Sequence, residues 1–263
     1  MLSAAVHPAC VPGYRMLRQV GAGRRSTAWL ASDLARGDEV VLKIQPGVHE
    51  ALRHEFEVAR QVAGKNIVQV REHGRAGAAC YLAMDYVAGG DLAERLRAGV
   101  TVDDAGSLLR QAAQALARLH RRGYVHRDVK PQNFLMRPDG SLVLADLGLV
   151  ARIGDRPAGV FGTLFGTPRY VAPEQLQGAA ASPAADVYSL GVLLHEMLAG
   201  APPFAGETLM EVLSQHLVAA PPRLPAAAAA LQPLVDRMLA KEAQSRLPDA
   251  DAVLGQLGQR WLP

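Results

Sequence analysis

The chain has 263 residues, 49% of them hydrophobic, and a formal net charge of +3. This hydrophobic content supports a sizeable core and excludes disorder for most of the chain, and the length fits one large domain or two lobes. The weak positive charge gives no reason to expect nucleic acid or an anionic membrane as a partner. The two cysteines, Cys10 and Cys80, lie far apart in the sequence, which argues against a disulfide framework and predicts a cytoplasmic setting.

The first residues show no pattern of a targeting segment. Residues 1–13 lack a basic region and a long apolar run, so a signal peptide is not expected here, and these residues are expected to form a flexible arm. A membrane-spanning helix needs a run of about 18 apolar residues, and none occurs in the sequence, so no span is expected within this chain.

Two short alternating stretches, residues 16–20 and 27–31, predict a β-hairpin. Its tip reads Gly21-Ala22-Gly23-Arg24-Arg25-Ser26. Taken alone, two glycines at this spacing indicate an ordinary turn as often as a functional loop, because glycine is the default turn residue.

The apolar stretch 40–43 predicts a strand that ends in Lys43. A helical period over residues 49–63 follows and carries Glu55. A lysine at a strand end commonly faces solvent, whereas a lysine that binds phosphates needs an anionic partner to hold it. Glu50 and Glu57 compete with Glu55 for that role.

The next elements lead to the central motif. Residues 68–70 and 80–87 predict two strands, with a turn at 73–77. The glycines at 89 and 90 suit a hinge between lobes. An amphipathic helix is predicted over residues 103–122, and Gly123 ends it.

A polar stretch, residues 126–133, holds Asp128, Lys130 and Asn133 within six positions. They are too close together for one face of a helix, but a loop can direct all three at one point. Asp146 follows thirteen residues after Asn133, and carboxylate and amide oxygens are ligands that suit Mg²⁺. For any one of these residues alone, a structural network of polar groups is the alternative.

Beyond Asp146 the sequence predicts a long loop and then helices. Residues 146–174 show little apolar periodicity and predict a loop. A helix that is apolar nearly all round is expected over 186–198. A proline-rich link at 219–225, a helix that begins at 226 and continues to 239, and a last short helix over 249–258 complete the chain.

Taken in order, these motifs resemble the catalytic domain of bacterial eukaryotic-like (Hanks-type) serine/threonine protein kinases over about residues 14–260. The resemblance rests on Lys43, Glu55, the 126–133 loop, Asp146 and the run 166–174, Gly-Thr-Pro-Arg-Tyr-Val-Ala-Pro-Glu. It implies an α+β, bilobal fold: a small β-rich N-lobe with one key helix over 14–87, and a larger, mainly helical C-lobe over 88–260.

The resemblance also implies an activity, namely transfer of the γ-phosphate of ATP to Ser or Thr hydroxyls of protein substrates, with Mg²⁺ as a cofactor. The catalytic residues would be Asp128, Lys130 and Asn133, and magnesium would bind to Asn133 and Asp146. The residues implied in ATP binding are Val20, Gly21, Ala22, Gly23, Ala28, Val41, Lys43, Glu55, Met84, Asp85, Val87, Asp91, Leu135 and Asp146. Asp91 can equally serve as a helix N-cap.

The same resemblance implies sites of phosphorylation and residues that hold the loop at 126–133 in place. Thr163 and Thr167 are candidates for phosphorylation, and a phosphate on Thr163 would bind Arg127. Self-association would allow one copy to phosphorylate another. Thr167 is expected to contact the catalytic Asp and Lys, Asp186 to anchor the backbone of the catalytic loop, and Arg246 to pair with the last residue of the 166–174 run.

Two other functions are weighed against this one. Ser26 stands where the family has a third glycine, and the small Ala28 stands where a larger apolar residue usually covers adenine. These departures motivate an ATP-binding pseudokinase or scaffold with weak catalysis as the alternative. A kinase acting on small molecules is disfavoured by the 167–174 segment, which in protein kinases builds the platform for a peptide.

Overall fold

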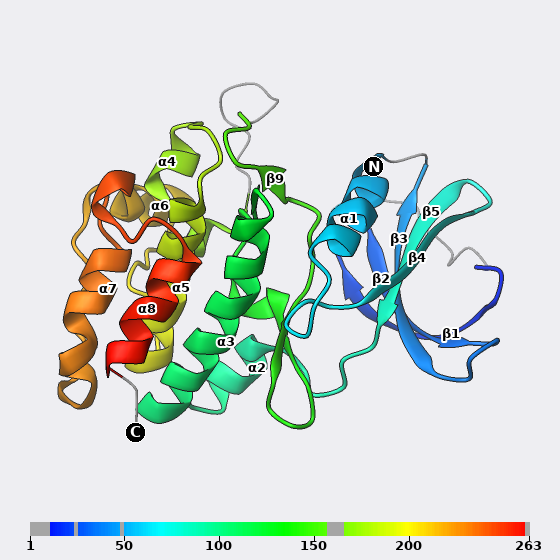
Figure 1. The fold of residues 1–263 in the computed structure, drawn as a ribbon, viewed down its shortest axis with the longest axis horizontal. Coiled ribbons are helices and arrows are strands. Elements are labelled where there is room, and N and C mark those ends of the chain that lie inside the picture. The colour runs from blue at the N-terminus through cyan, green and yellow to red at the C-terminus, as the bar shows by residue number, and fades with distance from the viewer. Residues whose placement is uncertain (1–10, 24–25, 48–49, 157–165, 261–263) are drawn as a thin grey trace. The chain divides into compact units, whose positions relative to one another are not determined.

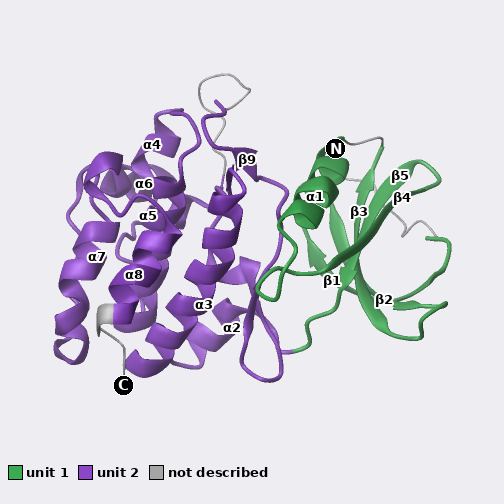
Figure 2. Ribbon diagram, viewed as in Figure 1, with its two compact units in different colours: residues 1–88 green, residues 89–263 purple. Residues whose placement is uncertain are grey.

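The computed structural model describes residues 11–23, 26–47, 50–156 and 166–260. They form two compact units, residues 1–88 and 89–263 (Figure 2), and each is treated by itself below. The predicted α+β architecture is confirmed, since a small unit built on one sheet is followed by a larger, mainly helical one (Figure 1).

The first unit is a five-stranded antiparallel sheet with one helix. The strand order is β1-β2-β3-β5-β4. The strands are β1 (Tyr14–Ala22), β2 (Thr27–Asp33), β3 (Glu39–Pro46), β4 (Val70–Ala76) and β5 (Ala79–Asp85), and the helix is α1 (Glu50–Gln61). The helix packs against β4 and β5.

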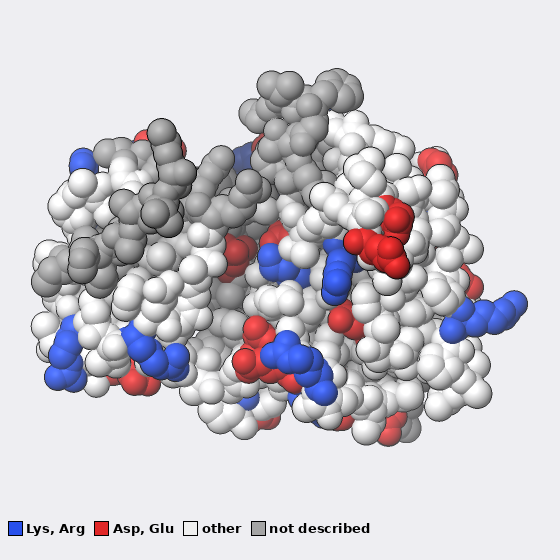
Figure 3. Space-filling model, turned by 180° about the vertical axis from the view of Figure 1, so that it is seen from behind, with Lys and Arg blue, Asp and Glu red and all other residues white. Residues whose placement is uncertain are grey.

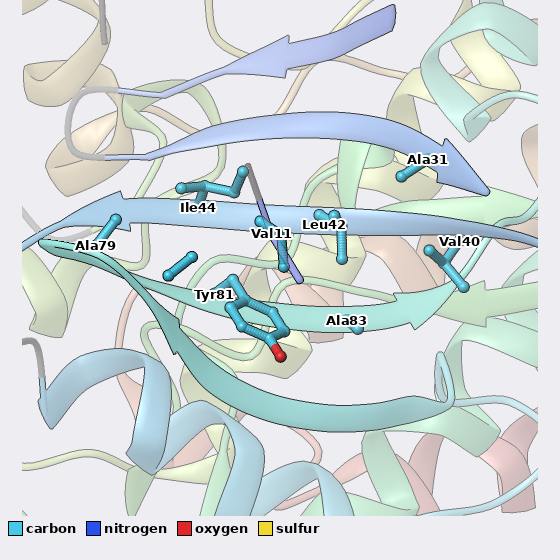
Figure 4. Close-up of a cluster of buried hydrophobic side chains, with 9 residues drawn as sticks. Val11, Ala31, Val40, Leu42, Ile44, Ala79, Tyr81 and Ala83 are labelled. Carbon is cyan, nitrogen blue, oxygen red and sulfur yellow. The ribbon is translucent and has the colours of Figure 1, made fainter. Parts of the chain in front are cut away.

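Buried apolar side chains, most of them from the strands themselves, form a cluster on one face of this sheet (Figure 4). Val40, Leu42 and Ile44 alternate along β3, and each is at most 1% exposed, because alternate residues of a strand share a face. Val11 is also fully buried in this cluster, so the described end of the predicted N-terminal arm packs against the sheet.

The predicted turn at residues 73–77 is wrong, because β4 continues to Ala76. Gly74 lies within the strand, opposite Tyr81 of β5. A Cβ on Gly74 would lie 2.6 Å from the Tyr81 ring, so this glycine makes room for a cross-strand aromatic side chain. The sequence alone does not distinguish such a glycine from a turn glycine.

The second unit is built mainly of helices. They are α2 (Leu92–Arg97), α3 (Val102–Arg121), α4 (Pro173–Leu176), α5 (Pro183–Ala199), α6 (Leu209–Val218), α7 (Gln232–Met238) and α8 (Ala250–Arg260). Short 3₁₀ helices are η1 (Pro131–Asn133), η2 (Pro168–Tyr170), η3 (Ala226–Leu231) and η4 (Ala243–Ser245). The short strands pair as β6 (Tyr124–Val125) with β9 (Ala151–Arg152) and β7 (Phe134–Met136) with β8 (Leu142–Leu144).

Helices α3 and α5 contact each other and form the centre of this unit. Thr101 starts α3 with a capping box, since its side chain accepts from Asp104 N–H at 3.1 Å and Asp104 accepts in return. Helix α5 is buried along most of its length, as its continuous apolar sequence predicts. A Cβ on Gly191 would lie 2.7 Å from the Cβ of Met238, so glycine permits the close approach of α5 and α7. None of the described helices combines the length and hydropathy of a membrane span.

Charged side chains of both signs lie close together on the face drawn in Figure 3. This agrees with the small net charge of +3 and with the ion pairs that join neighbouring side chains, such as Arg53 with Glu57.

Candidate active site

Four of the residues implied in ATP binding lie on one face of the sheet. Directly opposed residues of neighbouring strands share a face, and the strands pair Ala28 with Lys43 and Val41 with Met84. Val41 and Lys43 are two positions apart on β3, so they also share a face, opposite to the buried cluster. The sheet register therefore gathers Ala28, Val41, Lys43 and Met84 on one surface.

Helix α1 supplies the anion that holds Lys43. The Nζ of Lys43 lies 2.8 Å from Oε2 and 3.0 Å from Oε1 of Glu55, so the predicted pairing is confirmed. Glu55 is 3% exposed, and a carboxylate at such a site is stable only with a cation beside it. The pair therefore fixes the lysine ammonium on the face that carries Ala28 and Met84.

The glycine hairpin is closed by a backbone hydrogen bond, in which Gly23 N–H donates to the carbonyl of Ser26 at 2.8 Å. Gly21 lies opposite Ala28, and a Cβ on Gly21 would be 3.5 Å from that of Ala28, an ordinary contact. Local packing does not require glycine here, so its use in phosphate binding remains a prediction. Ala22 pairs with Thr27, and Val20 is 39% exposed.

Of two further residues implied in ATP binding, Asp85 is the last residue of β5 and Val87 lies just beyond it. The N–H of Asp85 donates to the carbonyl of Gln69 at 2.9 Å, so Asp85 can offer adenine only its carbonyl. Its carboxylate accepts from Nε of Arg71 at 2.7 Å, and the same guanidinium binds Asp38 through two hydrogen bonds. Arg71 was missed by the sequence analysis, because an arginine within a strand carries no local signal of its partners.

In the second unit, Asp91 and Leu135 are adjacent through an isolated β-bridge. The side chain of Asp91 accepts from Glu94 N–H at 2.8 Å, which confirms its role as N-cap of α2. Contact with a ribose remains a prediction for Asp91, and the bridge places Leu135 beside it.

The catalytic loop brings its polar groups together. Oδ2 of Asp128 lies 2.6 Å from Nζ of Lys130, and the hydroxyl of Thr167 donates to Oδ1 of Asp128 at 2.9 Å. Lys130 also donates to Oγ1 of Thr167 at 3.0 Å. Both contacts predicted for Thr167 are therefore confirmed, and Asp128, 8% exposed, has its two oxygens directed by separate donors.

The backbone of this loop is held from α5. Asp186, 1% exposed, accepts from His126 N–H at 2.7 Å and from Arg127 N–H at 2.8 Å, as predicted. Burial alone would raise the pKa of Asp186, but the hydrogen bond from His120 and the backbone donors hold its pKa below the usual range. His126 is fully buried and lies within the packing of the loop.

Two residues of the site have a left-handed backbone. Among the described non-glycine residues, only Arg127, with φ 69°, and Asp146, with φ 57°, have positive φ. Such a conformation costs on the order of 1–3 kcal/mol and persists where the surroundings determine it. Burial lowers the pKa of the Arg127 guanidinium, although arginine stays protonated at physiological pH.

The β7–β8 hairpin brings the two implied metal ligands to one end. Ala145 N–H donates to the carbonyl of Asn133 at 2.8 Å, and Asp146 is the next residue. The Nδ2 of Asn133 donates to the backbone carbonyl of Asp128 at 2.8 Å, which leaves Oδ1 as the atom that Asn133 can offer to a cation. An amide and a carboxylate oxygen suit Mg²⁺, which completes its shell with waters and phosphates. No cluster of three or more His, Cys, Asp or Glu suited to a metal occurs in the described chain.

Of the two candidate phosphorylation sites, Thr163 lies outside the described residues. Phosphorylation of Thr167 remains a prediction, and it would require the hydroxyl to leave Asp128 and Lys130. The segment that follows Thr167 is anchored by Glu174, whose carboxylate accepts from Arg246 at 2.6 and 2.9 Å. This ion pair confirms the predicted one.

Comparison with known proteins adds to this geometry. The profile of the family described as protein kinase domain matches residues 14–256. The serine/threonine-protein kinase drp72 of Corynebacterium efficiens is 34% identical over 255 residues, which are 91% of this chain and 49% of the relative.

Two further relatives have similar identities. PknA of Corynebacterium glutamicum is 34% identical over 90% of this chain and 54% of its own length. PknL of Mycobacterium tuberculosis is 35% identical over 86% of this chain and 59% of its own length. The chain thus spans about half the length of the curated relatives it matches. Since the family profile matches residues 14–256, the chain belongs to the protein kinase family and is homologous to bacterial serine/threonine kinases.

Proposed function

We propose that this chain is the catalytic domain of a serine/threonine protein kinase that uses ATP and Mg²⁺. The observation that carries the proposal is the triangle of Asp128, Lys130 and Thr167, with side-chain contacts of 2.6 to 3.0 Å. It joins the loop of the proton acceptor to the segment that in protein kinases supports the substrate peptide.

The residues divide the work of phosphoryl transfer. Asp128 accepts the proton of the substrate hydroxyl as the new O–P bond forms and the bond between the β- and γ-phosphates breaks. Lys130 neutralises charge on the transferred group, and Lys43 binds the phosphates that remain with ADP. Asn133 and Asp146 would hold magnesium, which when bound would neutralise charge on the phosphate oxygens.

Autophosphorylation is a further part of the proposal. Arg127 lies next to the catalytic aspartate, and arginine–phosphate pairs are strong and often bidentate. We propose that Thr163 is modified, by self-association of two copies, and that its phosphate binds Arg127. Mass spectrometry of protein incubated with ATP and Mg²⁺ tests this, and a fully active enzyme with unmodified Thr163 would contradict it.

The central test is incubation with labelled ATP, Mg²⁺ and a generic basic protein. We expect transfer to Ser or Thr of that protein, and loss of transfer in Asp128→Asn. Asp103→Asn is the matched control, because Asp103 is an exposed residue in the first turn of α3. Nucleotide binding without transfer by the wild-type protein would instead support the pseudokinase alternative that Ser26 and Ala28 motivate.

A further inference from the structure

Arg127, the residue directly before the proton acceptor, has a strained backbone conformation. Arg127 has φ 69°, a conformation that residues with a side chain rarely adopt. Its N–H is fixed by Asp186 at 2.8 Å. The orientation of the Asp128 carboxylate depends on the backbone that precedes it. A hydrogen bond to the carbonyl of Arg127, in addition to the one from its N–H, fixes that backbone on both sides of the residue.

The carbonyl of Arg127 is bound by the side chain of Gln175. Its Nε2 donates to the carbonyl of Arg127 at 3.0 Å, and its Oε1 accepts from the N–H of Ala172 at 3.1 Å. One amide group thus binds two backbone groups, one in the catalytic loop and one at the start of α4. The contact with Arg127 is not expected from the sequence, since glutamine after the Pro-Glu pair has no local signal of a partner 48 residues away.

The same carbonyl is also approached closely by the segment that carries Thr167. A Cβ on Gly166 would lie 2.9 Å from the Arg127 oxygen, and Gly166 has φ 96°. The catalytic loop, the Gly166–Thr167 segment and the start of α4 therefore meet at one oxygen atom, and Gln175 is the side chain that donates to it.

We infer that Gln175 is a positioning residue for phosphoryl transfer. It holds the Arg127 carbonyl, and through it keeps the Asp128 carboxylate at hydrogen-bonding distance from Thr167. This inference rests on the proposed kinase activity. The side-chain hydrogen bonds of Gln175 go to Ala172 and Arg127, which are neither reacting groups nor residues implied in ATP binding, so its loss should lower kcat and leave the KM for ATP unchanged.

Substitution by glutamate separates the two hydrogen bonds. Gln175→Glu keeps an oxygen that accepts from Ala172 N–H but replaces the donor to Arg127 by a second oxygen. We expect kcat to fall about tenfold, equivalent to about 1.4 kcal/mol. Gln177→Glu is the matched control, because it adds the same charge at an exposed position close by in the chain and should leave kcat unchanged.

Hydrogen–deuterium exchange provides a readout that does not depend on activity. In Gln175→Glu the amides of residues 124–133 should exchange faster than in the wild type, while those of α3 should not. A folded Gln175→Glu protein with wild-type kcat, or one with a lowered melting temperature and unchanged kcat, would overturn the inference. If the wild-type protein transfers no phosphate, the proposed function fails, and unchanged exchange over 124–133 would still refute the positioning role.

Discussion

His216 should make the free energy of unfolding of the second unit fall at acid pH, and the size of this effect follows from the surroundings of the ring. His216 is fully buried on α6, with its ring 4.9 Å from that of Phe204. The hydroxyl of Tyr188 lies 2.9 Å from its Nδ1 and accepts from Lys241 at 3.4 Å. The neutral ring can accept from this hydroxyl or donate to it, whereas a protonated ring would carry its charge next to the Lys241 ammonium.

Protonation of this ring would place a second cation beside Lys241 in a buried site. Burial, reinforced by the Lys241 charge, lowers the pKa of His216 from 6.5 to about 4. The unfolded chain binds the proton more readily than the folded one, so stability is complete above pH 6.5 and is lost as the pH falls toward 4. At about 1.4 kcal/mol per pKa unit, the loss reaches about 3 kcal/mol at pH 4 and about 2 kcal/mol at pH 5.

The assay is guanidinium chloride unfolding at several pH values between 8 and 4, for the wild type and for His216→Asn. Asparagine places an amide near the Nδ1 position and does not titrate. Because carboxylates titrate in both proteins, the difference between their free energies of unfolding isolates His216. That difference should be constant above pH 6.5 and shift by about 3 kcal/mol by pH 4. Parallel pH dependences for the two proteins would refute the reasoning.

Three further substitutions test the site. Lys43→Met removes the ammonium that neutralises Glu55, and should abolish transfer and lower the free energy of unfolding by about 3 kcal/mol, as activity and denaturation assays would show. Thr167→Val should lower kcat about 10- to 100-fold through the lost contact with Asp128, whereas Thr167→Ser should retain most activity. Arg246→Met removes a fully buried guanidinium from one carboxylate and three backbone carbonyls, and should destabilise the protein by about 3–5 kcal/mol; a melting temperature near that of the wild type would contradict this.

Long periodic elements were predictable from the sequence because burial imposes their pattern. The helix predicted over 103–122 is α3 (Val102–Arg121), and the one predicted over 49–63 is α1 (Glu50–Gln61). Helix α6 was not predicted, and its residues show why. It buries His216 together with Val212, while Met210 and Val218 are 72% and 78% exposed, so its apolar residues do not mark one buried face.

The candidate site was predictable where one segment carries the chemistry. Asp128, Lys130 and Asn133 lie within six residues, so chain connectivity alone keeps them together. Contacts between distant segments were not predictable without the resemblance, because a sequence does not show which distant group a side chain such as Gln175 or Arg71 will bind. The resemblance supplied the pairing of Lys43 with Glu55, which local patterns left open among three glutamates.

The backbone at the site reveals a second limit of local reasoning. Arg127 and Asp146 have a left-handed conformation, with φ 69° and 57°, although neither is glycine and neither lies in a sequence typical of a turn. Local preference opposes these conformations, and fixed partners such as Asp186 outweigh it. Arg127 directly precedes the implied proton acceptor Asp128, and Asp146 is itself an implied metal ligand. At both positions the left-handed backbone directs a side chain of the site in a way that a relaxed backbone would not allow.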